Sequence, residues 1–139
     1  MSLERTLAII KPDAVGRGLQ GEILARIHKA GFKIVAIKSV RLTKEEAGGF
    51  YAVHKERPFF PELTGFMSSG KIFALVLEAE GAILKWRDTM GATDPKKAAA
   101  GTIRRDLGTS IGNNCTHGSD APDTAAFEIG YFFSGLDLI

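Results

Sequence analysis

Three short apolar runs are separated along this chain by segments with helical periodicity. The runs are RTLAII at residues 5–10, KIVAIKSVRL at 33–42 and KIFALVLEA at 71–79. Apolar runs of this length, bounded by turn residues, are typical of buried strands. Because helices separate these strands, the pattern predicts an α+β fold in which helices cover one face of a small antiparallel sheet.

The helical segments carry recognisable start and stop signals. Helices are expected over residues 21–31, from about 44 to 55, within RPFFPELTGFMSSG (57–70), over 81–91, and after SDAP (119–122). Thr43 and Glu46 have the spacing of a capping box. Ser119 or Asp120 is expected to cap the last helix, with Pro122 in its first turn. With a weak fourth strand before the last helix, this order of elements fits a ferredoxin-like fold.

Nothing divides the chain into parts, so we expect one domain over residues 1–139. Residues 92–116, rich in Gly, Ala, Asn and Thr, are expected to form a long loop, which in a compact domain is usually functional. The net charge of +2 is too small to indicate a protein surface that binds nucleic acid or a membrane. The single cysteine, the missing signal peptide and the absence of a long apolar span predict a soluble cytoplasmic protein.

Phosphate binding would have to use side chains, because the sequence contains neither of the common glycine-rich phosphate motifs. The candidates at the ends of predicted elements are Lys11, Arg57, Arg87, Thr93, Arg104 and Arg105. Each alone is better explained as a solvated surface residue. Arg87 and Thr93 gain weight because they flank the long loop, and guanidinium groups bind phosphate with paired donors.

HKERPFF (54–60) places two adjacent phenylalanines beside a proline. Either ring alone is better explained as core. Because the two side chains face differently, one could be exposed and stack on a base, and Tyr51 could join the wall of such a cleft.

NNCTHGSDAPD (113–123) concentrates chemically versatile side chains around His117. A zinc site with Cys115 is disfavoured because no second ligand pair exists. A triad of Ser119, His117 and Asp120 is weak because close neighbours in sequence rarely align for proton relay. The residues alone leave a phosphate site at a helix N-terminus at even odds with a structural loop. The other two histidines, His28 and His54, are explained as ordinary helix residues.

The chain contains six notable blocks of sequence, which are ERTLAIIKPDAV (4–15), GFYAVHKERPFF (49–60), RDTMGATDP (87–95), GTIRRD (101–106), NCTHGSD (114–120) and EIGYFF (128–133). Together these blocks resemble the nucleoside diphosphate kinase family, and specifically its bacterial type. The resemblance covers essentially the whole chain. It implies the ferredoxin-like fold and a ping-pong reaction that moves the γ-phosphate of a nucleoside triphosphate to a nucleoside diphosphate, maintaining nucleotide pools.

The resemblance also implies catalytic roles for five residues. His117 would be the nucleophile that becomes phosphohistidine through Nδ1. Glu128 would orient the imidazole by bonding its other nitrogen, which spacing along the last helix permits. Ser119 would position Glu128, while Lys11 and Tyr51 would line the site, with Lys11 reaching phosphate and sugar.

For nucleotide binding, the resemblance assigns phosphate contacts to Arg87, Thr93 and Arg104, the sugar to Asn114 and base stacking to Phe59. Stacking without readout of base edges implies broad base tolerance. The implied cofactor is Mg²⁺, carried on the nucleotide phosphates and approached by Asp120 through water. The implied assembly is a homo-oligomer, either a tetramer or a hexamer, with no membrane and no obligate nucleic acid as partner.

Two residues fall outside the motifs. Arg105 adds a cation beside the loop that could tune phosphate affinity or a subunit contact. Cys115 is interpreted as a small packing residue rather than a redox-sensitive thiol. Two other hypotheses, an RNA-binding module and an inactive relative, are disfavoured by the apolar strands and by the presence of His117, Lys11 and Arg104.

Overall fold

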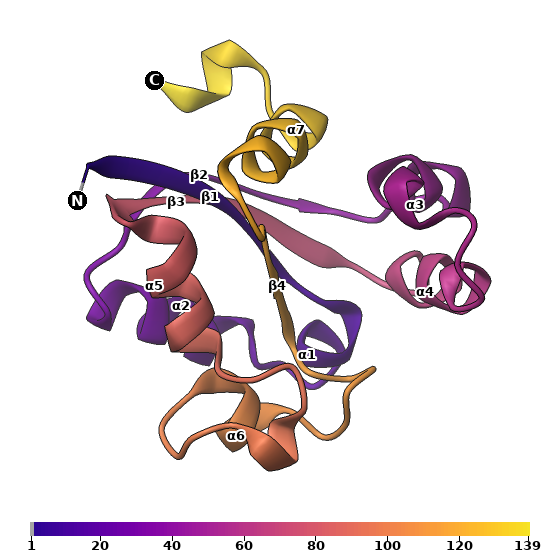
Figure 1. Ribbon diagram of the computed structural model, residues 1–139, viewed down its shortest axis with the longest axis horizontal. Coiled ribbons are helices and arrows are strands. Elements are labelled where there is room, and N and C mark those ends of the chain that lie inside the picture. The colour runs from indigo at the N-terminus through magenta and orange to yellow at the C-terminus, as the bar shows by residue number, and fades with distance from the viewer. Residues whose placement is uncertain (1) are drawn as a thin grey trace.

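The computed structural model describes residues 2–139, in which four strands form one antiparallel sheet. The strands are β1 (Leu3–Ile10), β2 (Lys33–Val40), β3 (Ile72–Glu80) and β4 (Thr116–Gly118). Their order across the sheet is β2-β3-β1-β4, and every pair is antiparallel (Figure 1). This order confirms the predicted ferredoxin-like α+β fold.

The five helices predicted from the sequence lie close to their expected positions, and two more, the first and the sixth along the chain, were not predicted. The helices are α1 (Pro12–Gly16), α2 (Gln20–Lys29), α3 (Lys44–Phe50), α4 (Phe60–Met67), α5 (Ala82–Met90), α6 (Ile103–Leu107) and α7 (Pro122–Phe132). Three single turns of 3₁₀ helix are η1 (Ala52–His54), η2 (Pro95–Lys97) and η3 (Gly135–Leu138). The capping box of Thr43 and Glu46 is confirmed, whereas the helix it starts ends at Phe50 and continues only as η1.

Helices cover both faces of the sheet, so the prediction of one covered face is wrong (Figure 1). Ala8 and Ile10 of β1 face a core built with α1, α2, α5 and α6. Leu7 and Ile9 face a second core built with α3, α4 and α7. The unbroken apolar run of β1 already carried this information, because a strand with one solvated face would alternate apolar and polar residues.

The segment predicted as a long loop contains two short helices, η2 and α6. The side chain of Asp94 accepts a hydrogen bond from the amide of Lys96, and Thr102 caps α6 by accepting from Arg105 N. Elements of three and five residues are too short to show an apolar period, which explains why the pattern predicted only loop.

The start of α7 also differs from expectation. Neither Ser119 nor Asp120 caps it. The cap residue is Ala121, whose amide donates to Thr124 Oγ1 at 3.0 Å, and Pro122 occupies the first turn as predicted. Ser119 instead joins β1, donating its amide to Leu7 O at 3.2 Å and accepting from Leu7 N at 3.3 Å.

The central strands fix the position of His117. In the β1–β4 ladder His117 pairs with Ile9, and Gly118 pairs with Ala8. Trp86 of α5 donates its indole N–H to the carbonyl of His117 at 3.1 Å.

Within residues 2–139, none of the helices has the length and apolar character needed to span a bilayer.

Candidate active site

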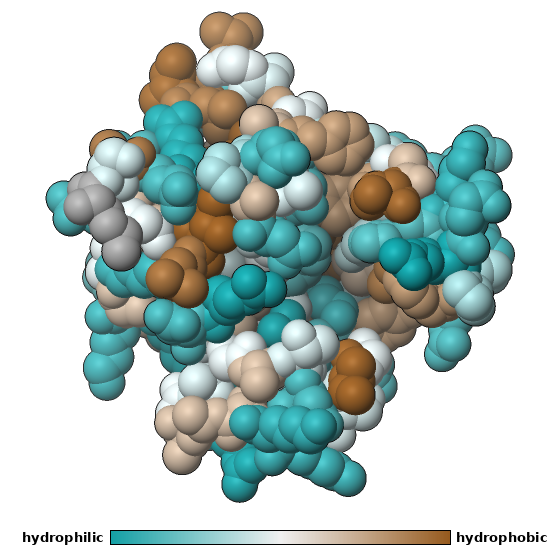
Figure 2. All heavy atoms as spheres, viewed as in Figure 1, coloured by the Kyte–Doolittle hydropathy of each residue, from teal (hydrophilic) through white to brown (hydrophobic). Residues whose placement is uncertain are grey.

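A cleft of about 560 Å³ opens where β4 meets the helices around it. Figure 2 shows the face of the molecule on which it lies, with a hollow between the lobe of α3 and α4 and the lobe of α6. Its lining contains Tyr51, His54, Phe59, Leu63, Arg87, Asp88, Met90, Gly91, Ala92, Thr93, Ala99, Thr102, Arg104, His117, Gly118, Ser119 and Asp120. Eight of the candidate site residues named from the sequence therefore line one cavity.

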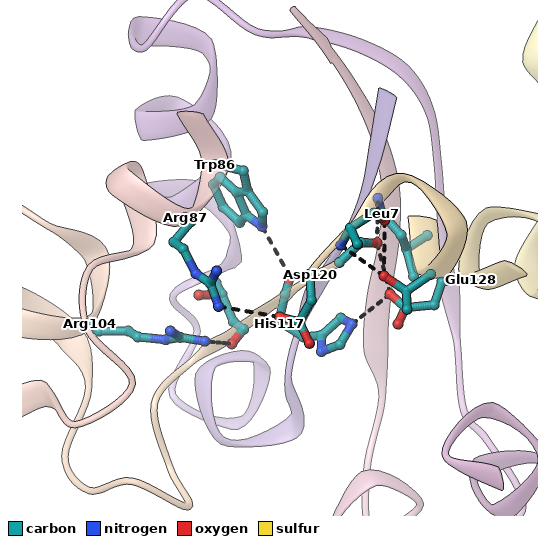
Figure 3. Close-up of polar contacts among 11 residues, drawn as sticks. Leu7, Trp86, Arg87, Arg104, His117, Asp120 and Glu128 are labelled. Atoms are coloured by element: carbon teal, nitrogen blue, oxygen red, sulfur yellow. Dashed lines mark hydrogen bonds and ion pairs between the residues drawn. The ribbon is translucent and has the colours of Figure 1, made fainter. Parts of the chain in front are cut away.

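The imidazole of His117 is held from one side by α7. Its Nε2 lies 2.9 Å from Glu128 Oε1, and Ser119 Oγ donates to the same carboxylate oxygen at 2.8 Å. Figure 3 shows the ring pointing from β4 toward Glu128 on α7. With Glu128 ionised, Nε2 carries the proton as donor, and Nδ1 then keeps its lone pair. No residue in the described range 2–139 is hydrogen-bonded to Nδ1.

Aromatic rings enclose the imidazole on its other sides. The ring centroid of Phe50 lies 5.5 Å from that of His117, and the centroid of Tyr51 lies 6.3 Å away, both edge-to-face. Burial, with a smaller contribution from Glu128, raises the pKa of Tyr51. The Tyr51 hydroxyl is therefore neutral at physiological pH and can donate a hydrogen bond.

Lys11, the first residue after β1, is almost fully buried, with 8% of its surface exposed. Its Nζ donates to Asn114 Oδ1 at 2.7 Å, and Asn114 Nδ2 donates to the carbonyl of Thr93 at 3.0 Å. The pKa of Lys11 is lowered to about 8, chiefly by burial; Asp13 opposes this shift, Arg104 adds to it, and Cys115 opposes it. A buried ammonium with one protein acceptor can attract an anion.

Arg104 of α6 is fixed by backbone carbonyls. It donates from Nη1 to Gly91 O at 3.1 Å and from Nη2 to Thr116 O at 2.8 Å. Its Nε is buried and has no hydrogen-bond partner among residues 2–139. Burial, and next the charge of Arg87, lower the pKa of Arg104, which shows that two like charges have been placed close together. Such a pair is stabilised by an anion between or beside it.

Arg87 of α5 and Asp120 form the rim of the cleft. Arg87 Nη2 lies 3.4 Å from Asp120 Oδ1, and both side chains are largely exposed (Figure 3). A long, exposed ion pair of this kind contributes little to stability, so both groups are free to exchange partners. Within residues 2–139 no cluster of three acidic, histidine or cysteine side chains could hold a metal unaided.

Phe59, immediately before α4, presents a half-exposed ring to the cleft; 48% of its surface is accessible. Its centroid lies 5.6 Å from the ring of His54. The adjacent Phe60 packs against the core instead. The expectation that the two phenylalanines face differently is confirmed.

Two of the arginines named as candidates for phosphate binding lie outside the site. Arg57 and Arg105 do not line the cleft, and Arg105 donates to the carbonyl of Lys96. Cys115 is fully buried in the core, consistent with a packing role, and burial raises its pKa to about 11.

His117 contacts Glu128, and not Cys115 or Asp120, which the disfavoured zinc and triad alternatives would have given it as partners. His117 also sits in a strand and contacts the second turn of α7, not a helix N-terminus.

The sequence analysis missed three residues that shape the site. Phe50 flanks the imidazole, Trp86 holds the carbonyl of His117, and His54 lines the cleft beside Phe59. A signal existed for Phe50, which is adjacent to Tyr51. The sequence carried no such signal for Trp86, because the contact of Trp86 with His117 depends on how α5 crosses the sheet.

Fold and cleft together define a ferredoxin-like protein with a histidine and several cations around one cavity. The family model described as nucleoside diphosphate kinase matches residues 4–138. A nucleoside diphosphate kinase of Syntrophotalea carbinolica is 61% identical over 99% of this chain and 100% of its own length. One from Bradyrhizobium sp. is 60% identical, covering 100% of this chain and 99% of its own length.

Solved structures give the same result. The nucleoside diphosphate kinase of Aquifex aeolicus superimposes with a TM-score of 0.97 at 50% identity, covering 99% of this chain and 100% of that one. The Halobacterium salinarum enzyme in complex with CDP gives a TM-score of 0.94 at 44% identity, over 99% of this chain and 92% of that one. The chain belongs to the nucleoside diphosphate kinase family and is thus a phosphotransferase acting on nucleotides.

Proposed function

We propose that this enzyme transfers the γ-phosphate of a nucleoside triphosphate to a nucleoside diphosphate in two half-reactions, through a phosphohistidine at His117. In the first, Nδ1 attacks the γ-phosphorus, the N–P bond forms and the bond to the β-phosphate oxygen breaks. In the second, a terminal oxygen of the diphosphate attacks the same phosphorus and Nδ1 leaves. The role in the cell is the balancing of nucleotide pools.

The observation that carries this proposal is the bond between His117 Nε2 and Glu128. It supports a tautomer whose nucleophilic lone pair is on Nδ1, and Ser119 fixes the carboxylate that sets it. When Nδ1 gains the phosphoryl group, the ring becomes cationic, and Glu128 stabilises that charge. A nucleophile oriented by a second group that is itself oriented is the general arrangement of covalent catalysis.

Phosphoryl transfer requires placement and charge neutralisation more than further covalent help. Arg87, Arg104 and Thr93 supply the donors for phosphate oxygens, and Lys11 supplies a buried positive charge. Mg²⁺ would add Lewis-acid charge on the phosphates. The site fits such an ion because two exposed carboxylates, Asp88 and Asp120, line the cleft, and Mg²⁺ usually binds through few protein ligands plus phosphates and water.

The nucleoside is proposed to bind with its base on Phe59 and its sugar near Asn114 and Lys11. The half-exposed ring of Phe59 supports a stacking role. Tyr51, whose hydroxyl is neutral, closes the cleft beside His117.

The first test uses γ-labelled ATP and Mg²⁺ with the enzyme alone. We expect an acid-labile, base-stable label on the protein that discharges to added GDP. His117→Ala should take up no label, whereas His28→Ala, a matched control on the exposed side of α2, should label like wild type. EDTA should slow labelling strongly. Label that persists in His117→Ala would falsify the assignment of the nucleophile.

A second test concerns the base. If Phe59 recognises the base only by stacking, transfer from ATP to GDP, CDP and UDP should differ by no more than about tenfold in kcat/KM, since stacking distinguishes bases weakly. Phe59→Ala should raise KM for all acceptors together, and Phe59→Tyr should not. Restriction of wild type to a single base would contradict the stacking role.

A further inference from the structure

Cys115 has a backbone conformation that side chains rarely adopt. Its φ is +73°, and within residues 2–139 no other non-glycine residue has positive φ. The amide of Thr116 donates to the carbonyl of Asn114 at 2.9 Å, across Cys115, so these three residues form a γ-turn. A γ-turn with positive φ is strained for a residue with a Cβ, and it persists only when its surroundings hold it.

Two hydrogen bonds from the start of α1 hold this turn. Asp13 accepts from Cys115 N through Oδ2 at 3.1 Å, and the amide of Lys11 donates to Cys115 O at 2.8 Å. The other carboxylate oxygen of Asp13, Oδ1, is buried and has no hydrogen-bond partner among residues 2–139. An unsatisfied buried oxygen is unfavourable, so stability alone does not explain this placement.

The strained residue stands between Asn114 and Thr116, which each contact residues of the site. On one side, the Asn114 side chain joins Lys11 to Thr93. On the other, the Thr116 carbonyl accepts from Arg104. If the turn relaxed to negative φ, the Asn114 side chain and the Thr116 carbonyl would both be redirected.

We propose that Asp13 is a positioning residue for nucleotide binding: by holding Cys115 in the γ-turn, it aims Asn114 toward the sugar subsite and fixes the carbonyl that orients Arg104. The proposal rests on the proposed function in so far as those two residues hold the nucleotide. It leaves His117, Glu128 and Ser119 outside the effect, since they are held by β1 and α7 instead.

The hydrogen bond and the strain can be separated by substitution. Asp13→Ala removes the acceptor, whereas Asp13→Asn retains an amide oxygen that can accept from Cys115 N. Cys115→Gly removes the strain, because glycine adopts positive φ without steric cost. The double variant Asp13→Ala/Cys115→Gly should then keep the turn without the acceptor. A purely structural role for Asp13 would make the two substitutions additive.

The test measures binding of ADP to unphosphorylated protein by calorimetry at pH 6.5, below the Lys11 pKa of about 8. Asp13→Ala and Asp13→Asn both remove the charge that raises this pKa, so a difference in binding between these two variants does not come from Lys11. We expect Asp13→Ala to weaken binding about tenfold, and Asp13→Asn and the double variant to return to within threefold of wild type. Binding by Asp13→Ala within threefold of wild type would overturn the proposal. So would equal weakening in Asp13→Ala and the double variant.

Folding is checked by circular dichroism and thermal melting. If Asp13→Ala unfolds while the double variant folds and binds ADP, the strained turn is what Asp13 holds, and the proposal stands. If neither folds, the role of Asp13 is structural and the proposal fails. None of these outcomes depends on the phosphohistidine, because the labelling experiment on wild type and His117→Ala decides that separately.

Discussion

Lys11 is a charged residue that is almost completely buried. Its pKa is lowered to about 8, chiefly by burial, with a smaller contribution from the charge of Arg104. The cost of burying an ammonium is offset when an anion replaces the lost water. The same burial that suits Lys11 to its proposed role as a phosphate ligand therefore also makes its charge sensitive to mild alkali.

We expect kcat/KM for ATP to fall as pH rises above about 8, because the free enzyme then loses the Lys11 proton and with it the charge that attracts phosphate. Below that pKa, kcat/KM should not change with pH until the pH is low enough to protonate the nucleotide phosphates. The measurement is a pH profile of kcat/KM between pH 6 and pH 10.

The control is Lys11→Arg, whose guanidinium keeps its proton over this range. In that variant the alkaline limb should disappear even if the absolute rate is lower. A wild-type profile that stays level to pH 9.5 would contradict the assignment of Lys11 as a phosphate ligand.

Individual site residues were predictable from the sequence where they belong to a dense motif. His117, Ser119 and Asp120 stand close together in the chain and line the same cleft. Asp13 lies in the block ERTLAIIKPDAV, but its role was not predicted, because its partner Cys115 lies 102 positions away. A hydrogen bond between distant backbone and side-chain groups leaves no local pattern to read.

Among the four strands, β4 has the fewest residues and the most demanding position. It has three residues, and each lies at a fixed register against β1. A slip of one residue would turn His117 to the opposite face of the sheet. The two hydrogen bonds between Ser119 and Leu7 and the indole bond from Trp86 keep this register.

Gly118 of β4 lies directly against side chains of α5. A Cβ added there would lie 2.5 Å from Cδ1 of Trp86 and 2.8 Å from Cε of Met90. Since Trp86 is fully buried, its ring has little room to move. We expect Gly118→Ala to lower the free energy of unfolding by about 1–3 kcal/mol, as overpacking of a core does.

The matched control is Gly130→Ala in α7, where an added Cβ meets no atom within 4 Å. Alanine there should be neutral or stabilise by up to ~1 kcal/mol through helix propensity. Urea denaturation of both variants measures the difference. Equal stability of Gly118→Ala and wild type would show that Trp86 does not pack against β4 as described.

The elements that the sequence predicted well are those with enough residues to show a period. β1, β2, β3, α2 and α5 were all expected near their observed bounds. α6 and η2 were missed because they depend on single capping side chains, Thr102 and Asp94, and on packing against distant segments.

At the scale of the whole molecule, the order of elements was sufficient to predict the ferredoxin-like sheet, but not the number of faces covered. β1 and β3 are buried on both sides, since α3, α4 and α7 fold back over the face opposite to α2 and α5 (Figure 1). The assembly into a tetramer or hexamer, the Mg²⁺ and the cytoplasmic location stay predictions, because each involves partners or surroundings outside a single chain.

The pairing of β1 with β4 also governs when the protein becomes an enzyme during its synthesis. Leu7 and Ser119 are 112 positions apart. A ribosome that adds about 5–20 residues per second finishes β1 several seconds before it reaches the segment that completes the cleft. Until then β1 presents an open edge to other chains. A nascent chain that lacks this segment is therefore inactive, and the appearance of transfer activity indicates that β1 and β4 have paired.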